Sequence, residues 1–460
     1  MPSTQVAAAD GLHHEPFAHY CPNVVTRVMP FVAPICLLLT LFETPLSPRI
    51  RMSTVFHALA DPIDFSWSLI HKVAAWTECY NLTSGFVERE RLADGHIPKA
   101  RVVATIIVGL DEIAGPRQSS HQSFLEAAKH YIAIEAKSFV LWRLVALELA
   151  DHWKHGISAS LLFTVFYILQ LLGAAMSEFE VCCTPFAAVL LSWVVPLALL
   201  SGRIGGLGSP RACLDAISRF VEGITAEDAM VKYRTADSGM KRLRHDIQGV
   251  TSRKYAEYHP SVDGYRPWKA RSVNGSQQST IPSTAFIAAL PLIISTATFV
   301  SLLWIAGPDS TTHQWFLAPV LLGIWVLSTL LSQGICYRVS YKHQWHVTIA
   351  KDVAVATLIV LAIILLSTAS SINEANGSGI GSGPGADTEF GITINLLYEH
   401  GGVYRADYVS VLALCFGSQL CFYAAVVRKY RAGLMVMQWP EETRRLEYAQ
   451  LETRTAAWAS

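Results

Sequence analysis

Long, uninterrupted apolar runs constrain this chain more than any other feature of its sequence. A helix needs about 20 apolar residues to cross the hydrocarbon core of a bilayer. Six stretches meet that length: 157–176, 181–200, 284–306, 315–336, 353–371 and 408–427. A shorter run, 28–44, carries two prolines and is interpreted as a further span, with a buried or re-entrant helix as the alternative. Because such runs have no stable place in water, the sequence predicts a multi-pass membrane protein.

The composition agrees with that prediction. The 460 residues are 52% hydrophobic and 16% charged, whereas soluble domains carry about a quarter charged residues. The formal net charge is +0, so no global field attracts nucleic acid, and no nucleic-acid partner is expected. No basic stretch followed by an apolar run opens the chain, which predicts no cleaved signal peptide. Several cysteines lie in the apolar runs and are interpreted as small core residues: Cys36, Cys182, Cys183, Cys336, Cys415 and Cys421.

Positive charges flank the runs in an alternating pattern. Arg203 and Arg211 follow the run 181–200, while Arg428 and Lys429 follow the last run. The opposing connections, such as "SEFE" and "AGPDSTTH", contain no Lys or Arg. Because Lys and Arg are retained on the cytosolic side, we expect an N-terminus outside the cell or in a lumen and a cytosolic C-terminus.

The predicted fold is therefore all-α: a polytopic membrane helix bundle of about seven transmembrane helices with a cytosolic all-α segment. The expected organisation begins with a lumenal or extracellular tail at 1–27, the first transmembrane helix at 28–44 and a cytosolic amphipathic helical segment at 45–156. Two transmembrane helices at 157–200 and a cytosolic helix and basic loop at 201–280 follow. The chain then has four transmembrane helices within 281–427, with a flexible lumenal loop at 372–405, and a cytosolic tail at 428–460.

Two features of the predicted cytosolic segments indicate what these segments contact. Near residues 54–80 an apolar stripe recurs at helical spacing, which implies helices that pack on one another or on the inner leaflet. Its members are Phe56, Leu59, Ile63, Trp67, Ile70 and Ala74. The basic loop, with "MKRLRHD", is interpreted either as a contact for anionic lipid headgroups or as an ordinary solvated loop.

The stretch "SGRIGGLGSPR" invites comparison with a phosphate-binding loop. Such a loop must follow a β-strand or end in Gly-Lys-Ser/Thr, and this one follows an apolar helix. We therefore predict no nucleotide site, and instead an interfacial bend in which Gly205, Gly206 and Gly208 supply φ > 0. Ser209 and Pro210 are typical of the start of a helix. That helix is expected to bury an apolar stripe formed by Cys213, Leu214, Ile217, Phe220 and Val221.

Asn376, in "NGS", is an N-glycosylation acceptor in the predicted lumenal loop. Asn81 and Asn274 begin matching triplets, but the predicted topology places both in the cytosol. We expect glycan on Asn376 alone.

Two His-x-x-His motifs form the candidate metal site. They are His152 with His155 and His343 with His346, each beside a predicted cytosolic mouth of a span. Imidazoles at i and i+3 share a helix face and can ligate a metal. The alternative is a set of interfacial histidines in an aromatic belt, because Trp153 and Trp345 lie within the motifs. The cofactor, if any, is unknown, and no catalytic residue is assigned.

Acidic residues offer weaker candidates. Asp61 with Asp64 and Glu227 with Asp228 are paired carboxylates; Asp61-Pro62 is interpreted as a helix boundary, and Glu227 with Asp228 as a solvated turn. The interiors of the six long runs contain no Asp, Glu, Lys, Arg or His, which argues against an ion-coupled carrier. Five polar residues in or beside the runs are expected to form hydrogen bonds between helices: Gln170, Ser332, Gln333, Ser418 and Gln419.

The stretches "LLSWVVPLALLSGRIGGLGSPRACLDAISRF" and "DPIDFSWSLIHKV" resemble an uncharacterised family of multi-pass membrane proteins in filamentous fungi. The resemblance implies a fungal membrane protein, an accessory of secretion or secondary metabolism, and transfers no catalytic residue. The expected function is a non-enzymatic accessory, scaffold or sensor that handles or organises around lipophilic small molecules, with an unknown protein partner, in the plasma membrane or an endomembrane. The alternative is a membrane-embedded enzyme, with or without a metal, that acts on a lipophilic metabolite.

Overall fold

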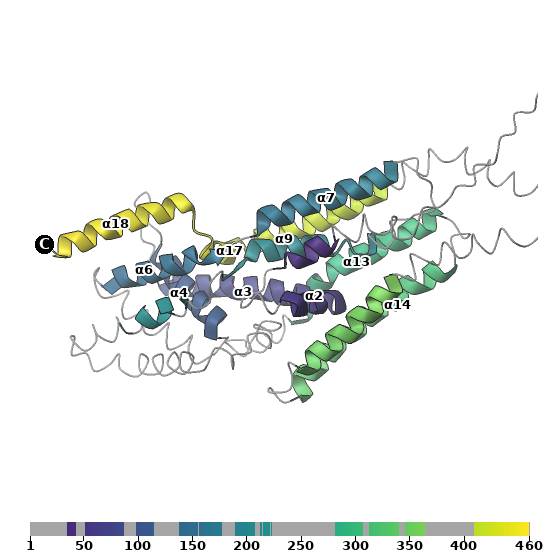
Figure 1. Cartoon of the computed structure of the whole chain (residues 1–460), viewed down its shortest axis with the longest axis horizontal. Coiled ribbons are helices and arrows are strands. Elements are labelled where there is room, and N and C mark those ends of the chain that lie inside the picture. The colour runs from purple at the N-terminus through teal and green to yellow at the C-terminus, as the bar shows by residue number, and fades with distance from the viewer. Residues whose placement is uncertain are drawn as a thin grey trace, which may run out of the picture.

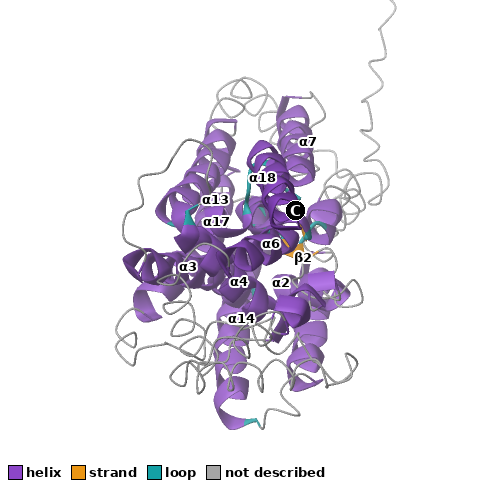
Figure 2. Ribbon diagram, turned by 90° about the vertical axis from the view of Figure 1, so that its left-hand side faces the viewer, coloured by secondary structure: helices purple, strands orange, loops and turns teal. Residues whose placement is uncertain are grey.

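The computed structural model of the chain describes residues 35–42, 51–86, 98–114, 138–154, 156–176, 189–207, 212–213, 215–220, 222, 281–306, 312–339, 346–363 and 409–459. Helices account for most of these residues (Figures 1 and 2), and the strands are a small patch, coloured orange in Figure 2. The predicted all-α class is confirmed at this level.

The helices and strands have the following bounds. The helices of the first half are α2 (Arg51–Ala60), α3 (Pro62–Phe86), α4 (Lys99–Ala114), α6 (Ser138–Asp151), α7 (Ile157–Met176) and α9 (Val194–Ile204). Those of the second half are α13 (Ile281–Ala306), α14 (Thr312–Arg338), α17 (Arg431–Met437) and α18 (Glu441–Ala459), together with two helices named here by their bounds, His346–Ile363 and Val409–Lys429. The strands β1 (Trp153–Lys154) and β2 (Gly206–Leu207) pair antiparallel.

Three helical segments are long and apolar enough to cross a membrane: Thr284–Leu302, His346–Ile363 and Val409–Lys429. Each falls in one of the runs predicted as spans. Three shorter apolar helical segments, Ile157–Leu172, Val194–Ile204 and Pro319–Ile335, fall in other predicted runs. The structure therefore supports a membrane protein with three such helices among the residues described.

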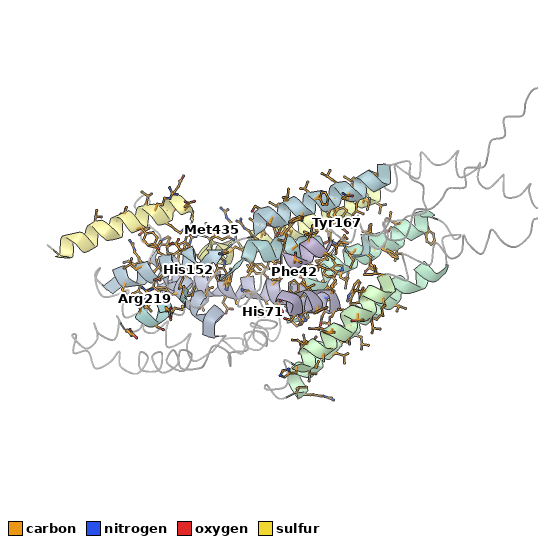
Figure 3. The ribbon with its side chains drawn as sticks, in the orientation of Figure 1. Phe42, His71, His152, Tyr167, Arg219 and Met435 are labelled. Atoms are coloured by element: carbon orange, nitrogen blue, oxygen red, sulfur yellow. The ribbon has the colours of Figure 1, made fainter. Side chains whose placement is uncertain are left out.

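Large apolar side chains project outward from these helices (Figure 3). On α7 and α14 the exposed ones recur at spacings of three and four residues, so they cover one helical face. They are Leu161, Leu162, Val165, Phe166 and Leu169 on α7, and Val320, Val326, Leu327, Leu330 and Leu331 on α14. Exposed apolar faces of this extent need a non-aqueous neighbour, and acyl chains supply one.

The cysteines expected in the core divide between core and surface. Cys415 is buried, but Cys36 and Cys421 are exposed on apolar helices. All three are free thiols. The expectation was wrong for Cys36 and Cys421, because a membrane helix places apolar residues on its outer face as readily as on its inner face. The side chains of Cys182, Cys183 and Cys336 lie outside the described set.

One hydrophobic core joins the apolar helices to the start of the predicted cytosolic segment. Ala58 of α2 and Phe65 of α3 belong to the same buried cluster as Trp193, Phe299 and Trp325. The indole rings of Trp193 and Trp325 meet edge to face, with centroids 6.1 Å apart. Thus α2 and the first turns of α3 pack among the apolar helices, which the stripe near 54–80 did not indicate.

A second core lies at the other end of the molecule, where α3, α4, α6 and α17 pack together. We call these helices, with α18 and residues 212–220, the helical platform (Figure 1). Its largest side chains meet edge to face: Trp76 contacts Trp153, and Trp142 contacts Phe220. The platform brings together parts of three segments that were predicted to be cytosolic, 45–156, 201–280 and 428–460.

The glycine-rich stretch forms a helix end followed by a strand. Helix α9 ends at Ile204, and the N–H of Gly205 donates to the carbonyl of Ser201. Gly205 has φ 72°, the one positive φ among the described glycines. The expectation of φ > 0 at Gly206 was wrong, because Gly206 pairs with Lys154 in the strand ladder. Gly208, Ser209 and Pro210 lie outside the described residues.

The stripe beyond this bend packs on protein. Cys213, Ile217 and Phe220 are all buried in the core of the platform. Leu214 and Val221 lie outside the described residues. The stripe was therefore correctly predicted as apolar, and its described members face neighbouring helices.

Candidate functional site

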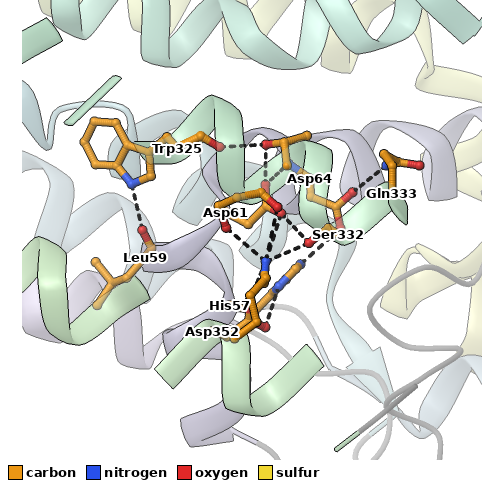
Figure 4. A network of polar contacts seen from close by, with 11 residues as sticks. His57, Leu59, Asp61, Asp64, Trp325, Ser332, Gln333 and Asp352 are labelled. Carbon is orange, nitrogen blue, oxygen red and sulfur yellow. Dashed lines mark hydrogen bonds and ion pairs between the residues drawn. The ribbon is translucent and has the colours of Figure 1, made fainter. Parts of the chain in front are cut away.

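A group of polar side chains lies buried between four helices. It occupies the place where the α2–α3 junction meets α14 and the helix His346–Ile363 (Figure 4). We call this group the buried polar network; its members are His57, Asp61, Asp64, Ser328, Thr329, Ser332, Gln333, Lys351 and Asp352. The side chains of its imidazole and three carboxylates are at most 1% exposed, and that of Lys351 is 9% exposed.

Asp61 anchors the network by a local interaction. Helix α2 ends at Ala60 and α3 begins at Pro62, so Asp61 occupies the N-cap position with proline after it. Its Oδ1 accepts the backbone N–H of Asp64 at 3.0 Å. The predicted helix boundary at this position is confirmed, and the cap fixes the carboxylate of Asp61 at the junction.

The same carboxylate binds α14. Thr329 donates to Oδ1 of Asp61 and Ser332 donates to Oδ2, each at 2.6 Å. Nearby, the indole N–H of Trp325 donates to the carbonyl of Leu59 at 2.9 Å. The spacing of Trp325, Thr329 and Ser332 places them on one face of α14, which therefore lies against the α2–α3 junction.

Lys351 supplies the amine of the network. Its Nζ lies 2.8 Å from Oδ1 of Asp352 and 3.3 Å from Oδ2 of Asp61. It also donates to the hydroxyls of Ser332 at 2.7 Å and Ser328 at 3.0 Å. A buried ammonium needs such partners, because an unpaired charge in an apolar interior costs several kcal/mol.

His57 lies between two carboxylates. Its Nδ1 is 2.9 Å from Oδ2 of Asp352, and its Nε2 is 3.4 Å from Oδ2 of Asp64. On the far side, the amide of Gln333 donates to Oδ1 of Asp64 at 3.3 Å. The ring of Phe65 stands edge-on to the imidazole, with centroids 6.3 Å apart, so an apolar wall borders the site.

The network contains more acid than base. Among the described contacts, three carboxylates face one amine and one imidazole. An imidazole thus lies within ion-pair distance of two buried carboxylates, and imidazole is a side chain that can carry a proton near neutral pH.

The sequence argument that the spans lack ionisable groups has to be corrected. It rested on a sixth span that starts at residue 353, but the helix starts at His346 and carries Lys351 and Asp352 inside a segment long enough to cross a membrane. The remaining charges come from α2 and α3, outside any predicted span. The signals were "DPID" and the "KD" pair that precedes the run, but nothing in the sequence indicates that they meet.

The predicted metal ligands are only partly described. His152 is half-buried in the turn after α6, and His346 is exposed at the start of its helix. His155 and His343 lie outside the described residues. Within the described part of the chain, no group of three or more His, Cys, Asp or Glu is placed to hold a metal ion. The four-histidine site stays a prediction.

The glycosylation and acidic-turn predictions fall mostly beyond the described residues. Asn376, Asn274, Glu227 and Asp228 all lie there. Asn81 is described, and its side chain is exposed near the end of α3.

The interhelical polar contacts are confirmed in part. Gln419 donates to the carbonyl of Pro291 at 2.8 Å and to the hydroxyl of Ser295 at 3.0 Å, so it joins Val409–Lys429 to α13. Ser332 and Gln333 also bond across helices, as described above. Ser418 instead donates to the carbonyl of Cys415 in its own helix.

Polar contacts also tie the C-terminal helices to the platform. Arg101 of α4 donates to the carbonyl of Gln438 at 2.7 Å and stacks over the Trp439 ring. Burial lowers the pKa of Arg101 to about 10, which leaves it cationic at neutral pH. On α18, Arg444 pairs with Asp151, and the hydroxyl of Tyr448 donates to Asp151 at 2.6 Å.

Two further pKa shifts belong to the platform. Burial raises the pKa of Tyr448 above its ordinary value, and its hydrogen bond to Asp151 raises it further. Burial, with the negative charge of Glu148, raises the pKa of the Cys213 thiol to about 12. Both groups are thus neutral at physiological pH, and Cys213 is a packing residue rather than a nucleophile.

No protein-family model, curated protein or solved structure matches this chain.

Proposed function

We propose that this chain is a multi-pass membrane scaffold that holds the helical platform rigidly on the cytosolic side of its membrane. The observation that carries the proposal is the position of α3, a helix of 25 residues and about 37 Å. Its Phe65 lies in the core of the apolar helices, whereas Trp67, Ile70 and Trp76 lie in the core of the platform. One continuous helix is thus shared by both cores, so the platform cannot turn freely relative to the bundle.

The proposed topology has seven spans, an N-terminus outside and a C-terminus in the cytosol. Its support is that the platform collects residues from all three of the longer segments whose flanking charges favour the cytosol. The end of Val409–Lys429 leads directly into α17 and the platform, in agreement with a cytosolic C-terminus. Under this topology the exposed faces of α7 and α14 contact lipid, and these helices are further spans.

The proposed activity is organisation rather than catalysis. The outer edge of the platform ends in α18, which carries charged residues of both signs, and ion pairs attach it to α6 at Arg143–Glu447 and Arg444–Asp151. A polar helix attached by ion pairs suits a protein partner in the cytosol, while the basic loop within 201–280 suits anionic headgroups. On the resemblance noted above, we assign the chain to the membrane accessories of secretion or secondary metabolism in fungi that handle lipophilic molecules.

The test compares two variants in cells that depend on the protein. One lacks α18, by truncation after Pro440, and the other carries His152→Ala with His343→Ala. A scaffold loses function with the truncation and keeps it with the histidine variant, provided that both are inserted in the membrane at wild-type amounts. Loss of function in the histidine variant alone, together with one or two metal ions per purified wild-type chain, would overturn the proposal in favour of a metal-dependent membrane enzyme.

A further inference from the structure

We propose that the buried polar network is a proton-binding site, with the proton held by His57 between Asp64 and Asp352. The bound proton fastens the α2–α3 junction to the helix His346–Ile363. This inference goes beyond the scaffold proposal and does not depend on it.

The first argument is the hydrogen-bonding capacity of imidazole. A neutral imidazole has one N–H donor and one bare nitrogen. In this network both nitrogens of His57 face carboxylate oxygens, at 2.9 Å and 3.4 Å. If His57 were neutral and both aspartates ionised, one bare ring nitrogen would lie beside a carboxylate oxygen. An additional proton, on the imidazole or on one of the two carboxylates, removes that repulsion and leaves the hydrogen bond to Asp352 and the 3.4 Å contact with Asp64 attractive.

The second argument is the charge that surrounds the imidazole. Asp61 and Asp64 approach from the α2–α3 side, and Lys351 and Asp352 approach from His346–Ile363. The contacts from α14 are made by hydroxyls and one amide, on Ser328, Thr329, Ser332 and Gln333. The only cation in these contacts is thus Lys351, among the described residues. A proton on His57 adds a second cation beside these three carboxylates.

The third argument is burial. The imidazole and its two flanking carboxylates are at most 1% exposed, so water does not screen their interaction. Intramembrane ionisable groups that pair with one another commonly form proton relays. Lys351 is the most exposed ionisable member of the network, at 9%, so it marks the side on which the network lies nearest the surface.

Loss of the proton has a mechanical consequence. Asp352 then faces Asp61 and Asp64 across a dry interface, and among the described residues Lys351 is the cation that remains beside them. Repulsion between these carboxylates weakens the contact between the helix His346–Ile363 and the α2–α3 junction. Because α3 continues into the platform, loss of the proton also weakens the attachment of the platform to the apolar helices.

The direct test is the protonation state of His57 in intact protein. The wild-type chain, labelled with nitrogen-15 histidine in lipid nanodiscs, is measured by NMR, and the His57 signal is identified by its loss in His57→Gln. Two protonated ring nitrogens at about pH 7, or one protonated nitrogen beside a carboxylic acid visible by infrared absorption, are the expected results. A neutral imidazole with all network carboxylates ionised would overturn the proposal.

A second test follows thermal unfolding between about pH 6 and about pH 9. A proton bound more tightly in the folded than in the unfolded protein adds stability at low pH, and this stability is lost as the pH rises and the folded protein releases it. The unfolding temperature of wild type is therefore expected to fall over this range, and that of His57→Gln to fall less. The matched control is His346→Gln, an exposed histidine on the same helix, which should keep the wild-type slope.

If the unfolding temperature falls with pH equally in wild type, His57→Gln and His346→Gln, proton binding at His57 is refuted. If His57→Gln does not fold, Asp352→Asn replaces it, since an amide keeps the shape while removing one negative charge. It is expected to flatten the slope in the same way, and an unchanged slope would again count against the proposal. A scaffold without a proton site would still pass the truncation test above, so the two failures are distinguishable.

Discussion

Asp61 shows how one residue can have a local role visible in the sequence and a distant role that is hidden. The N-cap role follows from Asp-Pro at the start of an apolar stretch, and the structure confirms it. The distant role requires Thr329, Ser332 and Lys351, which lie about 270 to 290 residues further along the chain. Single-sequence periodicity reports on neighbours within a few turns, so it contains no information on this pairing.

Replacement of Asp61 tests both roles. Asp61→Ala removes the cap of α3 and leaves Lys351 with less negative charge in a buried site. Breaking a buried pair by removal of one partner costs about 3–5 kcal/mol, and the cap adds about 1 kcal/mol. We expect a large fall in the unfolding temperature of the purified protein in detergent. Glu441→Ala removes an exposed i,i+4 partner of Arg445 and should change that temperature little; equal effects of the two changes would contradict the role of Asp61.

Gly205 is the residue at which the glycine-rich stretch depends on backbone freedom. Its φ of 72° with ψ −166° lies in a region that only glycine adopts readily, and a side chain there costs about 1–3 kcal/mol. Gly205→Ala is therefore expected to lower the yield of folded protein. A fluorescence-detected size-exclusion profile measures that yield. Normal folding accompanied by loss of saturable ATP or NAD binding would instead indicate the nucleotide loop that we exclude.

At the scale of elements, the sequence predicted that α3 is a helix, but it did not predict which helices surround it. The stripe Phe56, Leu59, Ile63, Trp67, Ile70 and Ala74 predicts one buried face. In the structure Val73 and Trp76 are buried as well, and so are the polar residues Ser66 and Lys72. Helices on several sides cover α3, since α4, α13 and α17 all pack on it. Two of these helices, α13 and α17, come from the second half of the chain, so the covering of side chains that look solvent-facing in the sequence could not be predicted locally.

The packing of α17 on α3 depends on the absence of a side chain at Gly433. A Cβ at that position would lie 2.6 Å from the backbone nitrogen of Thr77 and 2.7 Å from the carbonyl oxygen of Val73. Backbone atoms cannot move aside cheaply, so Gly433→Val should separate α17 from α3 and loosen the platform. We expect a lower unfolding temperature and faster proteolysis of the C-terminal helices. Gly417→Ala, where a Cβ meets nothing within 4 Å, is the matched control and should behave as wild type.

At the scale of the whole molecule, the sequence predicted which helices are compatible with a membrane better than it predicted which parts of the chain contact one another. Apolar runs of sufficient length identified Thr284–Leu302, His346–Ile363 and Val409–Lys429 as membrane-compatible helices, because that property depends on local composition. The buried polar network was missed, since its members are individually ordinary: a histidine in α2, a capping aspartate, and a Lys-Asp pair at the edge of an apolar run. Only the folded arrangement shows that they meet in a dry interior.

The proposed topology makes a prediction about the entire chain, which glycosylation can measure. Asn376 is expected to carry glycan because the loop 372–405 faces the lumen, where the transferase acts, whereas Asn81 lies in α3 near its platform end and is expected to remain unmodified. Expression in a eukaryotic host should give one glycosidase-sensitive species, and Asn376→Gln should abolish it. A membrane-impermeant thiol reagent provides an independent check: a single cysteine introduced at Ser460, in an otherwise cysteine-free chain that still folds, should react only after the membrane is permeabilised. A glycan that survives Asn376→Gln and disappears with Asn81→Gln would reverse the orientation, and with it the assignment of the platform to the cytosol.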